Sequence, residues 1–421
     1  MDEELLFTAD LFGNSFPINY EKEADQWLGN LQQYIVKFAT GIAGYGMTTQ
    51  QASRLFPYPH WEYTPNGVDG QGASLPKLKM VPVTGADGSK GLYFFAASNT
   101  ALIEEQLEIL RKAITGAKED LSKENPKFQW AAIIGQVNSF GVSIALGRRS
   151  SISNLKLRSG GGQHFSSQSS PTVSLYGSSF SISFPIVVEG VSSGYNWLVA
   201  TRQASQEVNK IAALLSVAWG TTIKLLHSPQ LSEPDKLKLP LVGNGGLQPV
   251  SMPKAKGFRA KRRTVPSWVE QAYLGLPSDS RLDNALNAHY QGLLMEATHP
   301  SFAMIAFVAS IEVLGRTIIG DKCSCCGKWT GNKERFTTGL RAVVKSQSEV
   351  KRLAEAYSSR SDTAHEGVLH ANETSLGSIV FPSMFSSDAK DLFAYTDLRQ
   401  IKDANRALLM LALKGRLKRV L

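Results

Sequence analysis

An arginine and a histidine stand five positions apart towards the end of the chain, at Arg360 and His365 of the segment Arg-Ser-Asp-Thr-Ala-His. Arginine is always cationic and offers a planar fork of donors that fits a phosphate group. Histidine can gain or lose a proton near neutral pH. Together the two side chains could cleave a phosphodiester bond without a metal ion. Because this spacing arises easily by chance in 421 residues, its surroundings must supply the specificity.

Two stretches supply that context. Residues 301–314 are almost entirely apolar but carry one carboxylate, Glu312, and residues 356–367 contain Arg360, Ser361 and His365. The combination resembles the Apea-like branch of the HEPN family, small helical domains with an R-x4–6-H motif. Many members of that family are ribonucleases of toxin and antiphage systems. The resemblance covers about the last third of the chain.

The resemblance implies a role for each of these residues. Arg360 would hold the scissile phosphate and stabilise its developing charge, and His365 would move a proton from the attacking 2′-OH or to the leaving 5′ oxygen. Ser361 stands where the wider family most often has Asn, Asp or His, and the Apea-like branch also has Ser there. Glu312 would pair with Arg360, or would only face a groove at a helix end. No cofactor is implied for catalysis.

Five residues along an ideal helix rotate by about 140°, so Arg360 and His365 would not share one face of a straight helix. Two arrangements resolve this conflict. The helix could end near Arg360, with Gly367 allowing a turn, or two copies of the chain could share one site about a two-fold axis. The second arrangement is usual in the HEPN family, and we therefore expect a homodimer.

The rest of the chain predicts a multidomain protein, with an N-terminal α+β domain and a C-terminal all-α, HEPN-like helical bundle. In residues 1–230, amphipathic stretches at 21–43, 99–114 and 202–226 predict helices. Between the second and third of these, alternating segments such as 180–188 predict antiparallel strands, giving a sensor or regulatory domain. In residues 266–421, helical periodicity at 282–293, 300–316, 333–359 (with a break) and 388–417 predicts a four-helix nuclease domain.

Residues 231–265 are rich in Pro, Gly and Lys and predict a linker between the two domains. Its second half carries a cluster of basic side chains without an acid: Lys254, Lys256, Arg259, Lys261, Arg262 and Arg263. Such a cluster is either a solvated linker or an arm that contacts nucleic-acid phosphates without reading sequence.

All three cysteines of the chain, Cys323, Cys325 and Cys326, fall within four residues, which is unlike a disulfide framework. Cys323 and Cys326 have the spacing of half a zinc knuckle, and Cys325 could be a third thiolate ligand. Structural zinc needs four ligands, so the fourth would come from a histidine, an acid or another subunit. The alternative is a reduced loop without metal.

Composition agrees with an RNA partner. The net charge is +9, and residues 261–421 hold 22 basic against 16 acidic side chains. No apolar run reaches the length of a membrane span, and the chain starts with Met-Asp-Glu-Glu, which is acidic where a signal peptide would be basic. We therefore expect a cytoplasmic protein without a membrane partner.

These observations predict a metal-independent endoribonuclease of antiphage defence, abortive infection or a toxin system. A phage-derived trigger or an inhibitory partner would act through the N-terminal domain. The alternative is a non-catalytic HEPN module that serves as a dimerisation or nucleic-acid-binding scaffold, because many members of the family have lost the motif.

Overall fold

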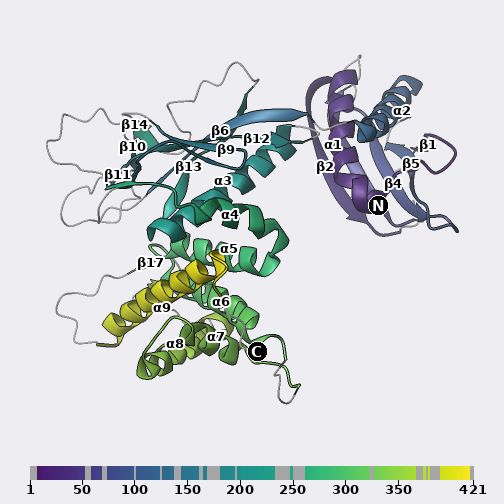
Figure 1. Ribbon diagram of the computed structural model, residues 1–421. Helices are drawn as coiled ribbons and strands as arrows, with labels where there is room; N and C mark the ends of the chain where they lie inside the picture. The colour runs from purple at the N-terminus through teal and green to yellow at the C-terminus, as the bar shows by residue number, and fades with distance from the viewer. Residues whose placement is uncertain are drawn as a thin grey trace. The chain divides into compact units, whose positions relative to one another are not determined.

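A computed structural model describes residues 7–52, 58–68, 74–98, 101–123, 126–136, 144–160, 165–167, 181–194, 197–232, 247–249, 261–322, 327–366, 373–375, 378–379 and 389–417 (Figure 1). The chain forms two compact units. The first comprises residues 1–128 with 193–200, and the second comprises residues 129–192 with 201–421.

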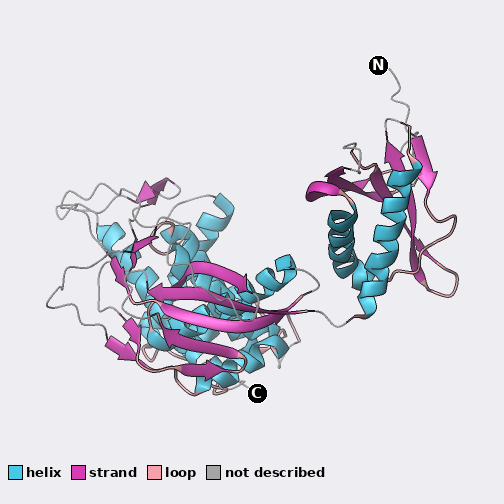
Figure 2. Ribbon diagram, turned by 90° about the horizontal axis from the view of Figure 1, so that it is seen from above, coloured by secondary structure: helices cyan, strands magenta, loops and turns pink. Residues whose placement is uncertain are grey.

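The first unit is an antiparallel sheet with the strand order β1-β5-β4-β3-β2, and two helices lie side by side on one of its faces (Figure 2). Its elements are β1 (Phe7–Asp10), α1 (Tyr20–Phe38), β2 (Thr40–Gln50), β3 (His60–Val68), β4 (Lys77–Thr84), β5 (Lys90–Ser98), α2 (Glu104–Glu119) and a 3-10 turn (Asp120–Ser122).

Alternation along the strands explains this packing. Leu78 and Met80 of β4 and Phe94 of β5 are fully buried, and Trp27 of α1 packs on Phe94 with a ring-centroid distance of 5.3 Å. The α+β prediction is confirmed for this unit. The helix predicted over 21–43 ends earlier, at Phe38, because the glycine-rich residues that follow pair with β3 as the edge strand β2.

The second unit begins with another antiparallel sheet, of order β13-β6-β12-β9-β8. Its strands and the helix that crosses between them are β6 (Lys127–Gln136), β8 (Ser150–Ile152), β9 (Leu155–Ser159), β12 (Ile186–Ser193), α3 (Trp197–Trp219) and β13 (Ile223–Ser232). Smaller pairings involve β7 (Ile144–Leu146), β10 (Phe165–Ser167), β11 (Ser181–Ser183), β14 (Leu247–Pro249) and β15 (Lys261–Arg263). The strand predicted over 180–188 is therefore divided between β11 and β12, on either side of Phe184 and Pro185.

The C-terminal region is helical. It contains α4 (Trp268–Gly275), a 3-10 turn (Leu276–Ser278), α5 (Ser280–Met295), α6 (Pro300–Ile319), α7 (Asn332–Arg341), α8 (Gln347–Glu366) and α9 (Ala389–Leu413), with short strands β16 (Glu373–Ser375) and β17 (Ser378–Ile379). Helix α6 packs against α5, α7, α8 and α9 and is the central helix of this region (Figure 1). Its apolar residues face several neighbours at once, as expected of a helix that is hydrophobic nearly all round.

Helix α6 is also the one described helix that is long and apolar enough to cross a membrane by length and composition. Half of the apolar window that meets this test is buried inside the fold. Buried residues such as Phe307, Ile311 and Leu314 belong to the core of the second unit, so packing against other helices explains its composition.

One hydrophobic core joins the second sheet, α3 and the C-terminal helices. Hydrogen bonds cross the same junction: Tyr290 Oη donates to the carbonyl oxygen of Ile223 at 2.9 Å, and Arg406 Nε donates to that of Val217 at 2.7 Å. The predicted boundary at residues 231–265 differs from this division, in which the chain separates near residue 128. The Pro, Gly and Lys composition of that stretch therefore does not mark the division between the two units. Its described end, β15, pairs in parallel with β7.

Candidate functional site

The Arg360–His365 motif lies on α8, which continues without a break past Arg360 and Ser361 to Glu366. A helix that ends near Arg360 is therefore not what this chain forms, and an ideal helix separates positions 360 and 365 by about 140°. The side chains of these motif residues lie outside the described part of the structure. The backbone alone shows that one chain presents the two positions on different sides of one helix.

The described side chains of α8 show how the helix is held. Val350 and Leu353 are buried, and Tyr357 packs against Phe336 of α7 at a ring-centroid distance of 5.7 Å, which confirms the predicted apolar stripe. Thr363, between the two motif positions, is also buried. The motif thus lies on a helix that is packed into the second unit on both sides of Arg360.

Arg352 adds a polar anchor between α8 and α9. Its two terminal nitrogens donate to Asp397 and Gln400, both on α9. A guanidinium that engages two acceptors in one plane fixes orientation as well as distance. The orientation of α8 is therefore set by an apolar stripe on one side and a forked hydrogen bond on another.

Glu312 lies on α6, which packs directly against α8, and it is half-buried. The helix that carries Glu312 and the helix that carries the Arg360–His365 motif are therefore neighbours in the fold. The predicted pairing of Glu312 with Arg360 involves a side chain outside the described residues, and it stays a prediction.

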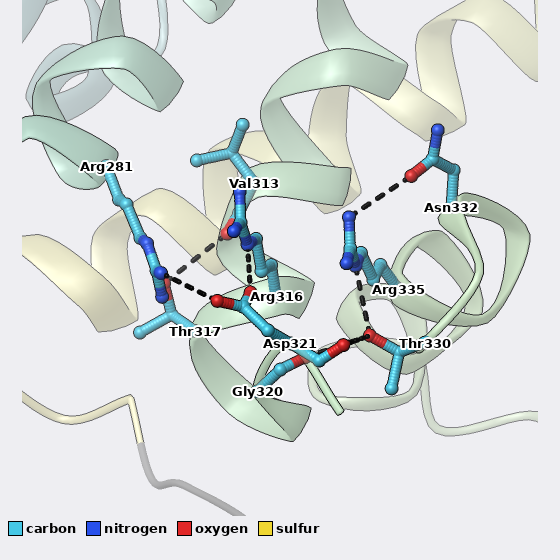
Figure 3. Close-up of polar contacts among 9 residues, drawn as sticks. All are labelled: Arg281, Val313, Arg316, Thr317, Gly320, Asp321, Thr330, Asn332 and Arg335. Carbon is cyan, nitrogen blue, oxygen red and sulfur yellow. Dashed lines mark hydrogen bonds and ion pairs between the residues drawn. The ribbon is translucent and has the colours of Figure 1, made fainter. Parts of the chain in front are cut away.

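Three arginines from three helices gather close to the C-terminal end of α6 (Figure 3). Arg316 Nε and Arg281 Nη2 both donate to the carboxylate of Asp321, the latter at 3.4 Å. In the segment that follows α6, Thr330 Oγ1 accepts a hydrogen bond from Arg335 Nε at 3.1 Å (Figure 3). We call Arg281, Arg316 and Arg335 the arginine cluster. Its members are far apart in sequence, and no spacing pattern indicated it.

The charges of the cluster act on the one carboxylate between them. The pKa of Asp321 is lowered, chiefly by the hydrogen bond from Arg316, with the charges of Arg281 and Arg335 adding to it. Asp321 therefore stays ionised beside these three cations.

Glycines let α7 approach α6 at this point. A Cβ atom on Gly315 of α6 would lie 1.9 Å from the carbonyl oxygen of Arg335, and one on Gly339 of α7 would lie 2.6 Å from Ile311. Only a residue without a side chain fits where two backbones come this close. Gly315 thus places Arg335 beside the end of α6.

The cysteines Cys323, Cys325 and Cys326 lie outside the described residues, but both ends of their loop are described. Lys322 and Trp329 form an isolated antiparallel bridge, and Gly327 has a φ of +69°, a conformation that glycine adopts readily. The loop is therefore closed at its base, while the zinc site stays a prediction.

Half of the predicted basic arm, Lys254, Lys256 and Arg259, also lies outside the described residues. The other half, Lys261, Arg262 and Arg263, forms β15, where Lys261 and Arg262 are exposed. These two side chains are available to a polyanion. Since β15 pairs with β7, they belong to the fold of the second unit and not to a free linker.

His289, on α5, is a buried histidine that sequence analysis did not single out. Only 1% of it is exposed, its Nδ1 donates to Asn405 Oδ1 of α9, and its Nε2 has no hydrogen-bond partner among the described residues. Burial lowers the pKa of His289 to about 4. A histidine that stays neutral at pH 7 and has no access to solvent packs the core and is not a proton shuttle.

A second perturbed group lies between α3 and α4. Burial raises the pKa of Glu207 to about 7, and its Oε2 has no hydrogen-bond donor among the described residues. Burial and the Glu207 charge also raise the pKa of Tyr273, and Lys210 Nζ lies 6.0 Å from the centre of that ring. The Glu207 carboxylate is thus under-stabilised at neutral pH.

A comparison of the chain with protein-family models, curated proteins and solved structures finds no match. The resemblance to the HEPN family therefore rests on the residues and motifs of the last third of the chain. The function has to be inferred from the chemistry of those residues.

Proposed function

We propose that the chain is a metal-independent endoribonuclease in which Arg360 and His365 cleave RNA. The observation that carries this proposal is the placement of both motif positions on one well-anchored helix, α8, packed against the helix that bears Glu312. A proton-transfer group and a phosphate clamp on a packed helix have the fixed geometry that catalysis requires. The helical region would then be a HEPN-like nuclease domain, and Glu312 would orient Arg360.

The reaction would be an internal transfer at phosphorus. The ribose 2′ oxygen forms a bond to phosphorus while the bond to the 5′ oxygen of the next nucleotide breaks, leaving a 2′,3′-cyclic phosphate and a 5′-OH. One proton leaves the 2′-OH and one reaches the 5′ oxygen, which are the two transfers that histidine can perform. Arg360 would neutralise the charge that builds up on the non-bridging oxygens.

The unbroken helix favours a shared site. Since one chain carries its arginine and its histidine about 140° apart on α8, a homodimer would let the His365 of one chain face the Arg360 of the other. The proposed homodimer, with RNA bound across its axis, forms through the C-terminal helices.

The physiological setting that we propose is cytoplasmic antiphage defence or a toxin system, with the first unit as a sensor or restraint. A phage-derived trigger or an inhibitory partner would act on that unit. Its compact fold, with a core of its own, suits a separate regulatory part.

The alternative is a non-catalytic dimerisation or nucleic-acid-binding scaffold. The observation in its favour is the same 140° separation, because a single chain does not bring the two motif positions to one face. A scaffold would bind RNA and dimerise but leave every phosphodiester bond intact.

Single substitutions separate these functions. Arg360→Ala or His365→Ala should reduce RNA cleavage by purified protein in EDTA by on the order of 10²–10⁴ while folding and dimerisation persist. Arg341→Ala, which removes an exposed arginine at the end of α7, is the matched control and should cleave normally. Cleavage at the wild-type rate by either motif variant would refute the assignment.

Mixing the two inactive variants tests the shared site. Dimers that combine one Arg360→Ala chain with one His365→Ala chain should recover part of the activity, because one intact arginine and one intact histidine meet across the axis. A strictly monomeric protein that cleaves RNA at the full rate would contradict the shared site.

A further inference from the structure

Trp329 is exposed beside the arginine cluster. With 70% of its surface in solvent, it is the most exposed large hydrophobic residue of the described part of the chain. Single exposed hydrophobic residues are common on protein surfaces, so the charges and contacts around Trp329 decide what this ring can bind.

Trp329 is held in place by a built scaffold. Its neighbour Thr330 is buried, receives the Arg335 hydrogen bond and donates from Oγ1 to the carbonyl oxygen of Gly320 at 2.9 Å, and the Thr330 amide donates to that of Asp321 at 3.0 Å. Together with the bridge to Lys322, these contacts fix the backbone on both sides of the ring. The exposed position is therefore part of the fold.

One cation lies against the ring, and further basic side chains are close to it along the chain. Lys322 Nζ lies 5.2 Å from the ring centre, a distance typical of a cation–π contact. Residues 316–335 together with Arg281 carry six basic side chains against two acidic ones, Asp321 and Glu334. The six are Arg281, Arg316, Lys322, Lys328, Lys333 and Arg335. Trp329 and these six side chains form what we call the Trp329 surface.

The arginine cluster retains binding capacity. Each guanidinium has five N–H donors. Arg281 and Arg316 each use one of them on Asp321, and Arg335 uses two, one on Thr330 and one on Asn332. Asp321 neutralises one charge of the three and holds two of the guanidinium groups in fixed positions. A phosphate group would meet oriented donors and an excess of positive charge.

We propose that the Trp329 surface binds single-stranded nucleic acid, with a base stacked on the indole ring and phosphates at the surrounding cations. An aromatic platform with flanking Lys and Arg suits unpaired bases, whereas the bases of a duplex are stacked on one another and do not reach an isolated ring. An acidic protein would pair with the basic side chains, but it would give no role to the exposed indole ring. This inference rests on the proposed function only in making RNA the expected strand, and it assigns a substrate-binding surface outside α8.

Binding can be measured apart from cleavage in full-length protein that carries Arg360→Ala, by fluorescence anisotropy of labelled oligonucleotides. Trp329→Ala should weaken binding of a single-stranded RNA oligonucleotide by on the order of tenfold. Trp197→Ala is the matched control, because Trp197 is 66% exposed and lies at the start of α3, in the segment 193–200 that belongs to the first unit. It should leave affinity unchanged. Parallel titrations with single-stranded DNA distinguish a contact to the base and phosphate alone from one that also needs the 2′-OH.

The salt dependence supplies a second readout. Lys328→Ala should lower the slope of log affinity against log salt concentration by about 0.7 for each phosphate that the variant no longer neutralises. Equal affinity in the Trp329→Ala and parent proteins would overturn the proposal, as would tighter binding of a duplex or of a poly-glutamate peptide than of the single strand. A protein that binds single strands through Trp329 but never cleaves them would refute the nuclease and leave this surface intact.

Discussion

Protonation of His289 should destabilise the second unit as the pH falls. The pKa of this side chain is lowered to about 4 in the folded protein, against an ordinary value of 6.5. Burial is the main cause, and the charges of Arg406 and Lys402 act in the same direction against the hydrogen bond to Asn405. A lowered pKa means that the unfolded chain binds the proton more tightly than the folded chain. The stability that the neutral His289 side chain contributes is therefore complete above pH 6.5 and is lost as the pH falls towards 4.

The magnitude follows from the two pKa values. A difference of about 2.5 units corresponds to about 3 kcal/mol in the free energy of unfolding once the pH is well below 4. Between about pH 7.5 and about pH 5.5 the same relation gives a loss of about 1 kcal/mol.

Urea unfolding of wild type and His289→Gln at these two pH values measures this loss. The glutamine variant keeps a neutral polar group beside Asn405 but cannot titrate, so every other titration of the chain is common to both proteins. Wild type should lose about 1 kcal/mol more than the variant on acidification. If the free energy of unfolding changed equally with pH in the two proteins, His289 would not stay neutral in the folded state, and the reasoning would be wrong.

Three further predictions concern other positions. Gly315→Ala should destabilise the second unit by about 3 kcal/mol or more, because the new Cβ overlaps the Arg335 carbonyl oxygen, whereas Gly331→Ala, which meets nothing within 4 Å, should be nearly neutral in thermal unfolding. Glu207→Gln should raise stability at about pH 8 and lose this advantage towards about pH 5, since a raised carboxyl pKa costs stability above that pKa; an advantage that grows on acidification would contradict this. Elemental analysis should find zinc that Cys326→Ser removes, and metal-free wild type would exclude the site.

Periodicity predicted the helices well, because an amphipathic stripe is local information. Val350, Leu353 and Tyr357 are spaced along one face of α8, and the run from Pro300 ends as a helix close to the predicted position. The break predicted within residues 333–359 is the loop between α7 and α8. The extended course of residues 40–50 was missed because residues 40–43 were included in the predicted helix and glycine is uncommon in strands.

The division of the chain was harder to predict, because it depends on which elements share a core. Tyr290 and Ile223 are joined by a hydrogen bond although the linker composition separates them in sequence. The arginine cluster has the same origin in tertiary packing, since its members come from α5, α6 and α7. His289 could have been noticed as a polar residue next to the apolar stripe of Leu286 and Tyr290, but only the fold shows its burial.

The chemical ends of the RNA products test the central proposal most directly. Purified protein would be incubated with RNA in EDTA, and the newly formed ends would be identified for wild type and for the His365→Ala variant. The proposed reaction gives new 2′,3′-cyclic phosphate and 5′-OH ends with wild type and none with the variant. RNA left intact by wild type, or products that end in 3′-OH and 5′-phosphate, would contradict it.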